Sequence, residues 1–221
     1  MPTITTITAN FRDIRTDLCT IGADCGADKS PYNTATDYSH SYTPLYATLF
    51  APLQHSPLTV IGEMGILNSA SIRMWRQWFD HAQIHCWDLN HDYIRQCSEL
   101  NLSGVHVGQM DVTDADSIRA GLSSGGAYNI LIDDTTHDPL HAPLILGTCT
   151  EFLKPGAYFI IEDVIRSADE TIYQRALDEL DLWRYYSTVS FVLVSHDHSN
   201  VGGFDNDKLL VLARNNTPWA G

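Results

Sequence analysis

Residues 128–137 of the chain read YNILIDDTTH, and residues 158–163 read YFIIED. In both stretches a short apolar run ends in acidic residues. Gly126 precedes the first run and Pro155-Gly156 precedes the second, so both are typical of buried strands of a parallel sheet, with a crossover helix between them. Ligands bind at the carboxyl ends of such strands, and we therefore expect these acids to converge at one edge of the sheet.

The side chains that follow these two strands have the chemistry of a metal site. They are Asp133, Asp134, His137, Glu162 and Asp163. Carboxylate oxygens are the ligands that Mg²⁺ prefers, and an imidazole beside them can act as a base near neutral pH. In the alternative interpretation, the two aspartates cap the next helix and the histidine packs beneath the loop. Acids at two neighbouring strand ends favour the metal site.

The composition narrows the classes of function. The 27 acidic residues outnumber the 13 lysines and arginines, which gives a net charge of -14. Such a surface repels a phosphate backbone, so we expect no nucleic-acid partner. The five cysteines are scattered without a C-x-x-C pair, as in reduced thiols of a cytoplasmic protein. We find no apolar run of membrane-spanning length and no signal peptide, so we expect a soluble cytoplasmic protein with no membrane partner.

The order of predicted elements defines a fold class. We expect seven strands, at Leu58–Gly65, Gln83–Asp88, Gly104–Gly108, Tyr128–Asp133, Ala157–Glu162, Ser187–Ser195 and Lys208–Arg214. Helices are expected at Asn10–Ile21, Ser69–Phe79, His91–Leu100, Asp114–Leu122, Pro139–Leu153 and Ala168–Trp183. The stretch from Ser39 to Tyr46 leads into a further short helix that runs through Phe50. This alternation predicts a doubly wound, Rossmann-like α/β fold. Its seven-stranded sheet is mostly parallel, ends in an antiparallel hairpin and has its switch point between strands one and four.

The chain is expected to form one domain. Residues 1–55 would be an N-terminal cap of helix and loop, and residues 56–221 the core. The stretch from Gly22 to Tyr42 is long for a loop without a pattern of its own, which favours a functional role. His40, Tyr42 and Tyr46 at its end can also be simple aromatic packing.

Acidic residues end the first three strands as well. Glu63 and Gly65 close the first, Asp88 the second, and Asp111 follows the third. One such acid is more often a helix cap or a solvated turn, but three in register indicate an adenosine site. The first loop lacks the full G-x-G-x-x-G fingerprint, so a cofactor without a pyrophosphate fits better than NAD.

Several motifs together carry a family resemblance. They are Asp28-Lys29, HSYTPLY at 40–46, Glu63-Met64-Gly65, SIRMWR at 71–76, DDTTH at 133–137, LKPG at 153–156 and Glu162-Asp163. On these residues the chain resembles class I S-adenosylmethionine-dependent methyltransferases. It is most similar to the metal-dependent sugar O-methyltransferases of macrolide biosynthesis, of the mycinamicin and macrocin type.

The resemblance implies roles for individual residues. Glu63 would lie by the methionine moiety of S-adenosyl-L-methionine, Asp88 would hold the ribose hydroxyls, and Gln109 or Asp111 would lie near the adenine. The remaining cofactor-binding positions would be Gly65, Ser71, Leu89 and Asp133. Asp134, Glu162 and Asp163 match the Mg²⁺ ligands of the family. His137 matches its general base, and Asp134 would share in catalysis.

The chain departs from the family at two places. Ser69-Ala70 stands where members commonly have a Gly-Gly or Gly-Ala pair, and Thr135-Thr136 stands where they have Gly-Ser. The first departure can change how closely the backbone approaches the cofactor. The second can change the orientation of the His137 side chain. Neither removes a side chain that bears a ligand atom.

The function expected from these observations is Mg²⁺-dependent O-methylation of a small hydroxylated acceptor, a sugar or a natural product. A metal-dependent α/β hydrolase or oxygenase-like relative, and a non-catalytic nucleotide-binding module, stay open as alternatives. A homo-oligomer is compatible with the sequence.

Four further histidines are candidates for the site or its surroundings. His141 belongs to the core or lies behind the ligands, and His40 is the second candidate for the base. His196 and His198 form a possible metal pair, but a solvent-facing position is favoured, and the loop from His196 to Asp207 is interpreted as a substrate rim.

Overall fold

The structure is a computed structural model that describes residues 2–167, 169–196 and 207–220. Its centre is an eight-stranded sheet with the order β1-β7-β8-β6-β5-β2-β3-β4. The strands are β1 (Thr5–Asn10), β2 (Val60–Met64), β3 (Gln83–Asp88), β4 (Val105–Gln109), β5 (Tyr128–Asp133), β6 (Leu153–Val164), β7 (Tyr186–Ser195) and β8 (Lys208–Arg214). Only β8 runs antiparallel to its neighbours, β6 and β7. The predicted α/β class and terminal hairpin are confirmed.

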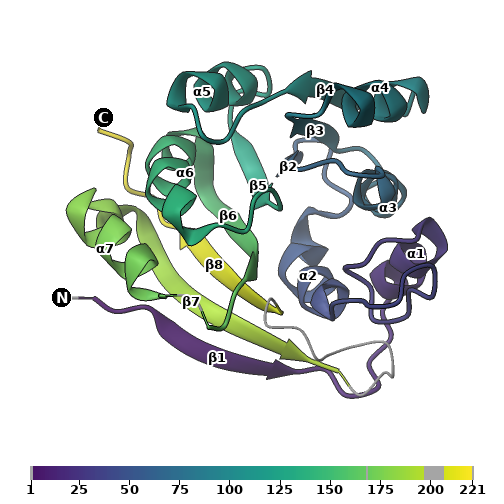
Figure 1. Ribbon diagram of the computed structural model, residues 1–221, viewed down its shortest axis with the longest axis horizontal. Helices are drawn as coiled ribbons and strands as arrows, with labels where there is room; N and C mark the ends of the chain where they lie inside the picture. Colours follow the sequence, from purple (N-terminus) through teal and green to yellow (C-terminus); the bar gives the residue numbers. More distant parts are fainter. Residues whose placement is uncertain (1, 168, 197–206, 221) are drawn as a thin grey trace.

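Helices cover both faces of this sheet (Figure 1). One face carries α1 (Asp17–Cys25), α2 (Tyr42–Phe50), α3 (Ala70–Trp78) and α4 (His91–Glu99). The other carries α5 (Ala115–Ser123), α6 (Ala142–Cys149) and α7 (Thr171–Glu179). Short 3₁₀ turns lie at Ala51–Leu53, Pro139–His141, Thr150–Phe152 and Leu182–Tyr185. Each face therefore has its own apolar core, as expected for a doubly wound sheet.

Local sequence explains most of these elements. The apolar residues Ile130, Leu131 and Ile132 of β5 are fully buried, because helices pack on both sides of this central strand. Side chains of Thr16, Asn90 and Asp114 accept hydrogen bonds from the first turns of α1, α4 and α5.

The switch point lies between β2 and β5, which are neighbours in the sheet although they are the first and fourth strands of the alternating core. The connections from these two strands leave on opposite faces of the sheet. The crevice at their carboxyl ends is thus open to a ligand, and the predicted position of the switch point is confirmed.

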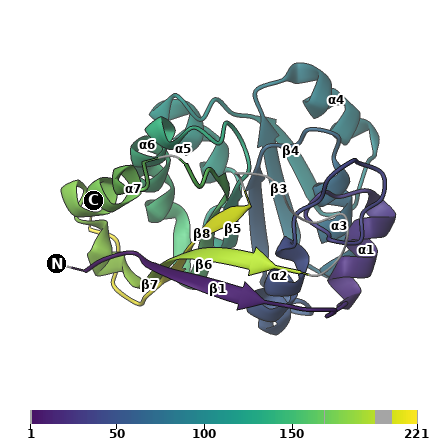
Figure 2. The same ribbon diagram turned by 60° about the horizontal axis from the view of Figure 1, so that its bottom comes forward.

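The N-terminal segment differs from the expectation. Residues 5–10 form an eighth strand, which lies parallel to β7 at the edge of the sheet (Figure 2). The following helix begins at Asp17 with Thr16 as its cap, not at Asn10. Thr5, Thr6 and Thr8 are exposed, so this strand has no buried stripe that distinguishes it from a polar tail.

Two expected helices are shorter than predicted. The crossover predicted over 139–153 is a 3₁₀ turn, α6 and a second 3₁₀ turn, and Leu153 already belongs to β6. The helix predicted over 168–183 is α7, followed by a separate 3₁₀ turn from Leu182. The apolar spacing continues past the end of α7 because Leu182 and Tyr185 of the following 3₁₀ turn are buried. No helix among the described residues is long and apolar enough to span a membrane.

Candidate active site

A cavity of about 560 Å³ opens at the carboxyl ends of β2, β3, β5 and β6. It brings together most of the residues that the sequence predicted for the cofactor and for catalysis. These are Gly65, Ser71, Asp88, Leu89, Asp111, Asp134, His137 and Asp163. These side chains lie close together because the parallel strands that carry them end at the same edge of the sheet.

Gly65 marks the closest approach of two strand ends in the cavity. Its φ is +102°, and a Cβ at this position would lie 2.0 Å from the backbone oxygen of Asp134. The backbone nitrogen of Asp134 in turn donates to the oxygen of Met64 at 2.9 Å. Only glycine fits here, because any side chain would push the end of β5 away from β2.

Asp88 organises the loop that follows β2. Its Oδ2 accepts hydrogen bonds from the backbone nitrogens of Ile66 at 2.8 Å and Leu67 at 3.3 Å. Its Oδ1 accepts one from the nitrogen of Asn90 at 2.8 Å. A carboxylate has further lone pairs, so Asp88 can shape this loop and still accept from a ligand hydroxyl.

Two residues were proposed for the adenine, and only one of them lines this cavity. Asp111 lies on its wall and accepts hydrogen bonds from the backbone nitrogen and hydroxyl of Thr113 at 2.9 and 2.6 Å. Gln109 is exposed and lines a separate groove beside His106 and Gly121. The exposed side chains of Leu67 and Leu89 supply apolar surface near Asp111 in the main cavity.

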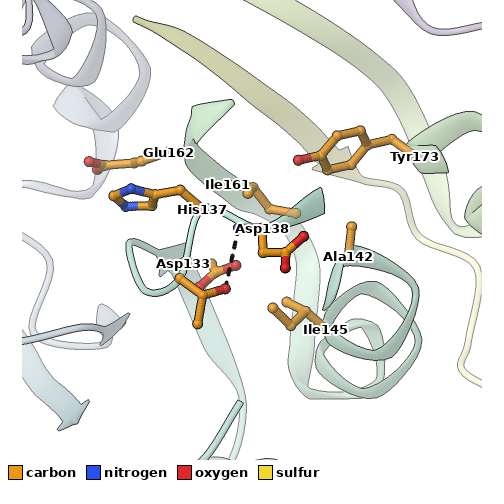
Figure 3. Close-up of a pocket in the computed structure, with 9 residues that line it drawn as sticks. Asp133, His137, Asp138, Ala142, Ile145, Ile161, Glu162 and Tyr173 are labelled. Carbon is orange, nitrogen blue, oxygen red and sulfur yellow. Dashed lines mark hydrogen bonds between the residues drawn. The ribbon is translucent and has the colours of Figure 1, made fainter. Parts of the chain in front are cut away.

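Asp133 and Glu162 line a second, much smaller cavity of about 10 Å³. In the close-up, the ring of His137 and the carboxylate of Glu162 extend to one side, whereas Asp138 and Tyr173 lie on the other (Figure 3). Burial is the main reason that the pKa of Asp133 rises to about 6, and the neighbouring Asp134 charge raises it further. Asp133 accepts a hydrogen bond from the Thr135 hydroxyl at 2.6 Å.

Glu63 is fully buried beneath the main cavity rather than on its wall. Its Oε2 accepts a hydrogen bond from the indole nitrogen of Trp75. Its Oε1 has no hydrogen-bond partner among the described residues, although Lys29 Nζ lies 3.8 Å away. A buried acceptor without a donor indicates a place where a ligand can donate.

Lys29 lies in the middle of the acids. Its side chain is only 2% exposed, and its ammonium lies 2.5 Å from Asp134 Oδ2 and 2.7 Å from Glu162 Oε2. Burial alone would lower the pKa of Lys29, but the charges of Asp134, Glu162 and Glu63 outweigh it and raise this pKa well above its ordinary value. Lys29 is therefore a fixed positive charge in the site.

Helix α2 adds two hydroxyl donors from the opposite side. Tyr42 donates to Asp163 Oδ1 and Tyr46 donates to Glu162 Oε1, each at 2.7 Å. Burial is the main reason that the pKa values of both tyrosines lie well above their ordinary value, so they stay protonated donors. His40 stacks on Tyr42 with ring centroids 4.8 Å apart, and its Nε2 lies 3.6 Å from Asp163 Oδ2.

A local irregularity places Glu162 and Asp163 on the same side of the sheet. Neighbouring residues of a regular strand point to opposite faces. Here the pairing of β6 with β8 shifts register between Ile161 and Val164, and Asp163 has a φ of +54°. This bulge turns both carboxylates towards α2.

His137 is held beside the acids by a similar backbone turn. Its φ is +53°, and its Nε2 lies 3.0 Å from Asp134 Oδ1. Its Nδ1 lies 3.8 Å from Asp163 Oδ2. Burial would lower the pKa of His137, but the hydrogen bond to Asp134 and the nearby negative charges raise it above its ordinary value.

Ligand atoms of Asp134, His137 and Asp163 all lie within 4.8 Å of one another, which is a spacing that one metal ion can bridge. The two carboxylates suit a divalent cation, and their oxygens favour Mg²⁺ over softer ions, while the imidazole beside them can act as a base. Glu162 lies outside this group, because its two oxygens face Lys29 and Tyr46. The role of Glu162 as a metal ligand stays a prediction.

The two departures from the family pattern have visible consequences. Ser69 adopts a φ of +62°, a conformation that glycine takes without strain. Thr135 donates to Asp133, and the Thr136 hydroxyl lies 2.8 Å from His141 Nδ1. His141 thus contacts the loop that carries His137, and its place outside the ligand set stays a prediction.

No role was predicted for Lys29, Tyr42 or Tyr46. Lys29 appeared only within a resemblance motif, and the two tyrosines were left as possible packing. One signal was present: Tyr42 and Tyr46 are four residues apart, so they lie on one face of α2. His196 is buried against Tyr32, with ring centroids 5.3 Å apart, and is not solvent-facing. His198 and most of the proposed substrate rim lie outside the described residues.

Comparisons with known proteins show which proteins the chain is similar to. The chain matches no protein-family model. It is 30% identical over 132 residues to 8-demethyl-8-(2-methoxy-alpha-L-rhamnosyl)-tetracenomycin-C 3'-O-methyltransferase of Streptomyces olivaceus, a match that covers 57% of this chain and 32% of that protein. It is 25% identical over 134 residues to mycinamicin VI 2''-O-methyltransferase of Micromonospora griseorubida, which covers 58% and 32%. The chain therefore spans about a third of the length of these relatives.

Solved structures show the same fold. MycE methyltransferase from the mycinamycin biosynthetic pathway, in complex with Mg, SAH and mycinamycin VI, superposes with a TM-score of 0.69 at 17% identity and covers 91% of this chain and 55% of that one. A putative O-methyltransferase from Klebsiella pneumoniae superposes with a TM-score of 0.57 at 15% identity and covers 92% of both chains. In sequence and in fold, the chain is thus similar to the sugar O-methyltransferases that its motifs indicated.

Proposed function

We propose that the protein is an S-adenosylmethionine- and Mg²⁺-dependent O-methyltransferase that acts on a hydroxyl group of a small acceptor, a sugar or a glycosylated natural product. The observation that carries this proposal is a single cavity that contains both the residues predicted to bind the cofactor and the residues predicted for the metal and the base. Asp88 and Asp111 line one part, and Asp134, His137 and Asp163 line another. A methyl donor and an acceptor can meet only where two such subsites share one space.

The donor subsite would be built by the ends of β2, β3 and β4. Asp88 would accept hydrogen bonds from the ribose hydroxyls, and Leu89 would give apolar contact to the adenine. Glu63 Oε1, which has no donor among the described residues, would face the methionine moiety. The order of these residues along the sheet edge supports a cofactor that lies across the switch point.

The acceptor subsite would lie beside Asp134 and Asp163, with His137 at its side. A Mg²⁺ ion bound there would supply a Lewis acid that lowers the pKa of the acceptor hydroxyl. His137 would take the hydroxyl proton on its imidazole, and Asp134 would hold that ring in place and stabilise the imidazolium. The acceptor oxygen would then bond to the methyl carbon while the bond from that carbon to the sulfonium breaks.

The relatives support the choice of acceptor class. The tetracenomycin and mycinamicin enzymes are named for methylation of sugar hydroxyls, and the MycE structure contains Mg and SAH. We carry this over to a small hydroxylated acceptor, because the acidic cavity wall suits a neutral or cationic ligand better than an anion.

The test is transfer of labelled methyl from S-adenosylmethionine to a panel of rhamnosylated and other glycosylated acceptors, with Mg²⁺ and with EDTA. The proposal expects product with Mg²⁺ and none with EDTA. Cofactor binding without turnover across the whole panel would favour a non-catalytic binding module. A chain that binds no S-adenosylhomocysteine in calorimetry would favour the hydrolase or oxygenase-like alternative.

A further inference from the structure

The buried ammonium of Lys29 lies beside the proposed metal site. It contacts the two carboxylates that come from different strands, Asp134 after β5 and Glu162 on β6, at 2.5 and 2.7 Å. Both were predicted as metal ligands. A cation that bridges two ligands of a second cation must affect how the second one binds.

Lys29 is fixed at both of its ends. Its backbone oxygen accepts hydrogen bonds from the nitrogens of Tyr42 and Thr43 at 3.1 and 3.0 Å, which satisfies the first turn of α2. The neighbouring Asp28 oxygen accepts from the nitrogen of His40 at 2.6 Å. The same segment thus sets the position of the ammonium and of the two tyrosine donors of α2.

The carboxylate oxygens divide into two groups by their partners. Glu162 uses Oε2 for Lys29 and Oε1 for Tyr46, and Asp134 uses Oδ2 for Lys29. The oxygens turned towards His137 are Asp134 Oδ1 at 3.0 Å and Asp163 Oδ2 at 3.8 Å. A divalent ion that also binds Glu162 must share an oxygen with Lys29 or with Tyr46, or displace one of them, and it approaches the Lys29 charge in either case.

We propose that Lys29 is a built-in counter-cation that keeps the acids assembled before the metal arrives and competes with Mg²⁺ for Asp134 and Glu162. This inference rests on the proposed metal-dependent function and adds a positioning residue to it. Two positive charges near one pair of carboxylates repel each other. Mg²⁺ therefore binds more weakly than the acids alone would allow, and it stays exchangeable.

Calorimetry with Mg²⁺ alone tests this on three variants. Lys29→Met removes the charge and keeps much of the apolar stem, so Mg²⁺ affinity should rise by about tenfold or more. Lys29→Arg keeps the charge and should bind Mg²⁺ within about threefold of the wild type. Lys154→Met is the matched control, because Lys154 binds Leu58 and Asn129 away from the acid cluster. Its Mg²⁺ affinity should not change.

Thermal unfolding gives a readout that is independent of turnover. Without metal, Lys29→Met leaves the buried carboxylates of Glu63, Asp134 and Glu162 uncompensated, so its melting temperature in EDTA should fall. Added Mg²⁺ should raise the melting temperature of Lys29→Met more than that of the wild type. A purely structural lysine would lower the melting temperature equally with and without Mg²⁺.

The wild-type protein offers a second measurement in case the variant does not fold. The chain contains three lysines, Lys29, Lys154 and Lys208, so labelling with ¹⁵N-lysine gives a simple spectrum of ammonium groups. Adding Mg²⁺ should move the Lys29 signal, with half-saturation at the calorimetric dissociation constant, and leave the Lys154 signal in place. An unchanged Lys29 signal at saturating Mg²⁺ overturns the inference.

The outcomes separate this inference from the proposed function. If Mg²⁺ binds the wild type, and binds a folded Lys29→Met variant equally or more weakly, the proposed role of Lys29 is wrong. The metal-dependent function is not affected by that result. A wild type that binds no Mg²⁺ and methylates in EDTA overturns the metal dependence itself, and the role of Lys29 falls with it.

Discussion

Asp134 and His137 are joined across one loop, with Asp134 Oδ1 3.0 Å from His137 Nε2. Because His137 has a left-handed backbone, its ring turns back onto the acid that precedes it by three residues. This relationship gives an imidazole a fixed orientation beside the proposed metal ligands.

His137→Ala should lower turnover by about 10² to 10⁴, the usual contribution of a general base. The affinities for S-adenosylmethionine and Mg²⁺ should change little. The wild-type rate should rise with pH as the imidazole loses its proton, and the variant should lose this rise. Steady-state rates across pH check the prediction, with the exposed His55→Ala as the control. A folded variant with undiminished turnover would move the role to another residue, with His40 next in line.

Asp88→Ala should weaken S-adenosylhomocysteine binding by about 1.5 to 3 kcal/mol, the range for hydrogen bonds to a charged group. Loss of the bonds to the nitrogens of Ile66 and Leu67 adds to this, because the loop after β2 loses its anchor. Calorimetry measures the change, and Asp92→Ala on the exposed side of α4 is the control. An unchanged dissociation constant would remove Asp88 from the cofactor site.

Asp133→Asn should stabilise the protein at neutral pH. The folded-state pKa of Asp133 is about 6 against an ordinary 3.8. The folded state therefore keeps this proton over a pH range in which the unfolded state has lost it, and stability falls as pH rises from about 4 to about 6. The amide removes this penalty, for a gain of up to about 3 kcal/mol.

Urea unfolding in EDTA at pH 4.5 and pH 7 measures this effect. The gain should be largest at pH 7 and fall to about a third of that value at pH 4.5. The exposed Asp116→Asn should show no such difference between the two pH values. A variant that is equally stabilised or destabilised at both pH values would show that Asp133 is not held protonated by burial.

Tyr46→Phe should destabilise the protein by about 1 to 3 kcal/mol, because Glu162 Oε1 loses its donor inside the core. Tyr158→Phe is a matched control: its ring also packs on Phe50, and its hydroxyl makes no hydrogen bond within the described residues. Urea unfolding compares the two. Equal losses in both variants would mean that the Tyr46 hydroxyl contributes nothing to the acid cluster.

The sequence predicted the sheet well, because buried central strands have a strong local pattern. The bounds of β3, β5 and β8 agree with the expectation. The strand β1 was missed because it lies at the edge of the sheet and fully buries no side chain, so its sequence lacks the apolar run of a buried strand.

Only the site residues that lie at the ends of the parallel strands could be predicted from the sequence. Acids at the ends of parallel strands must converge, which places Asp88, Asp134 and Asp163 together. The bulge at Asp163 cannot be read from an apolar run followed by two acids. Lys29 and Tyr46 reach the site through the packing of a segment outside the alternating core. The spacing of Tyr42 and Tyr46 places both on one face of a helix, but it does not indicate what that face contacts.

The central claim is that the acids at the ends of β5 and β6 hold a divalent cation beside the cofactor. Its most direct test is anomalous diffraction from a crystal grown with S-adenosylhomocysteine and Mn²⁺ in place of Mg²⁺. We predict one anomalous peak within about 2.0 to 2.4 Å of carboxylate oxygens of Asp134 and Asp163, on the cavity side of His137. Clear density for the cofactor with no anomalous peak at these residues would contradict the account.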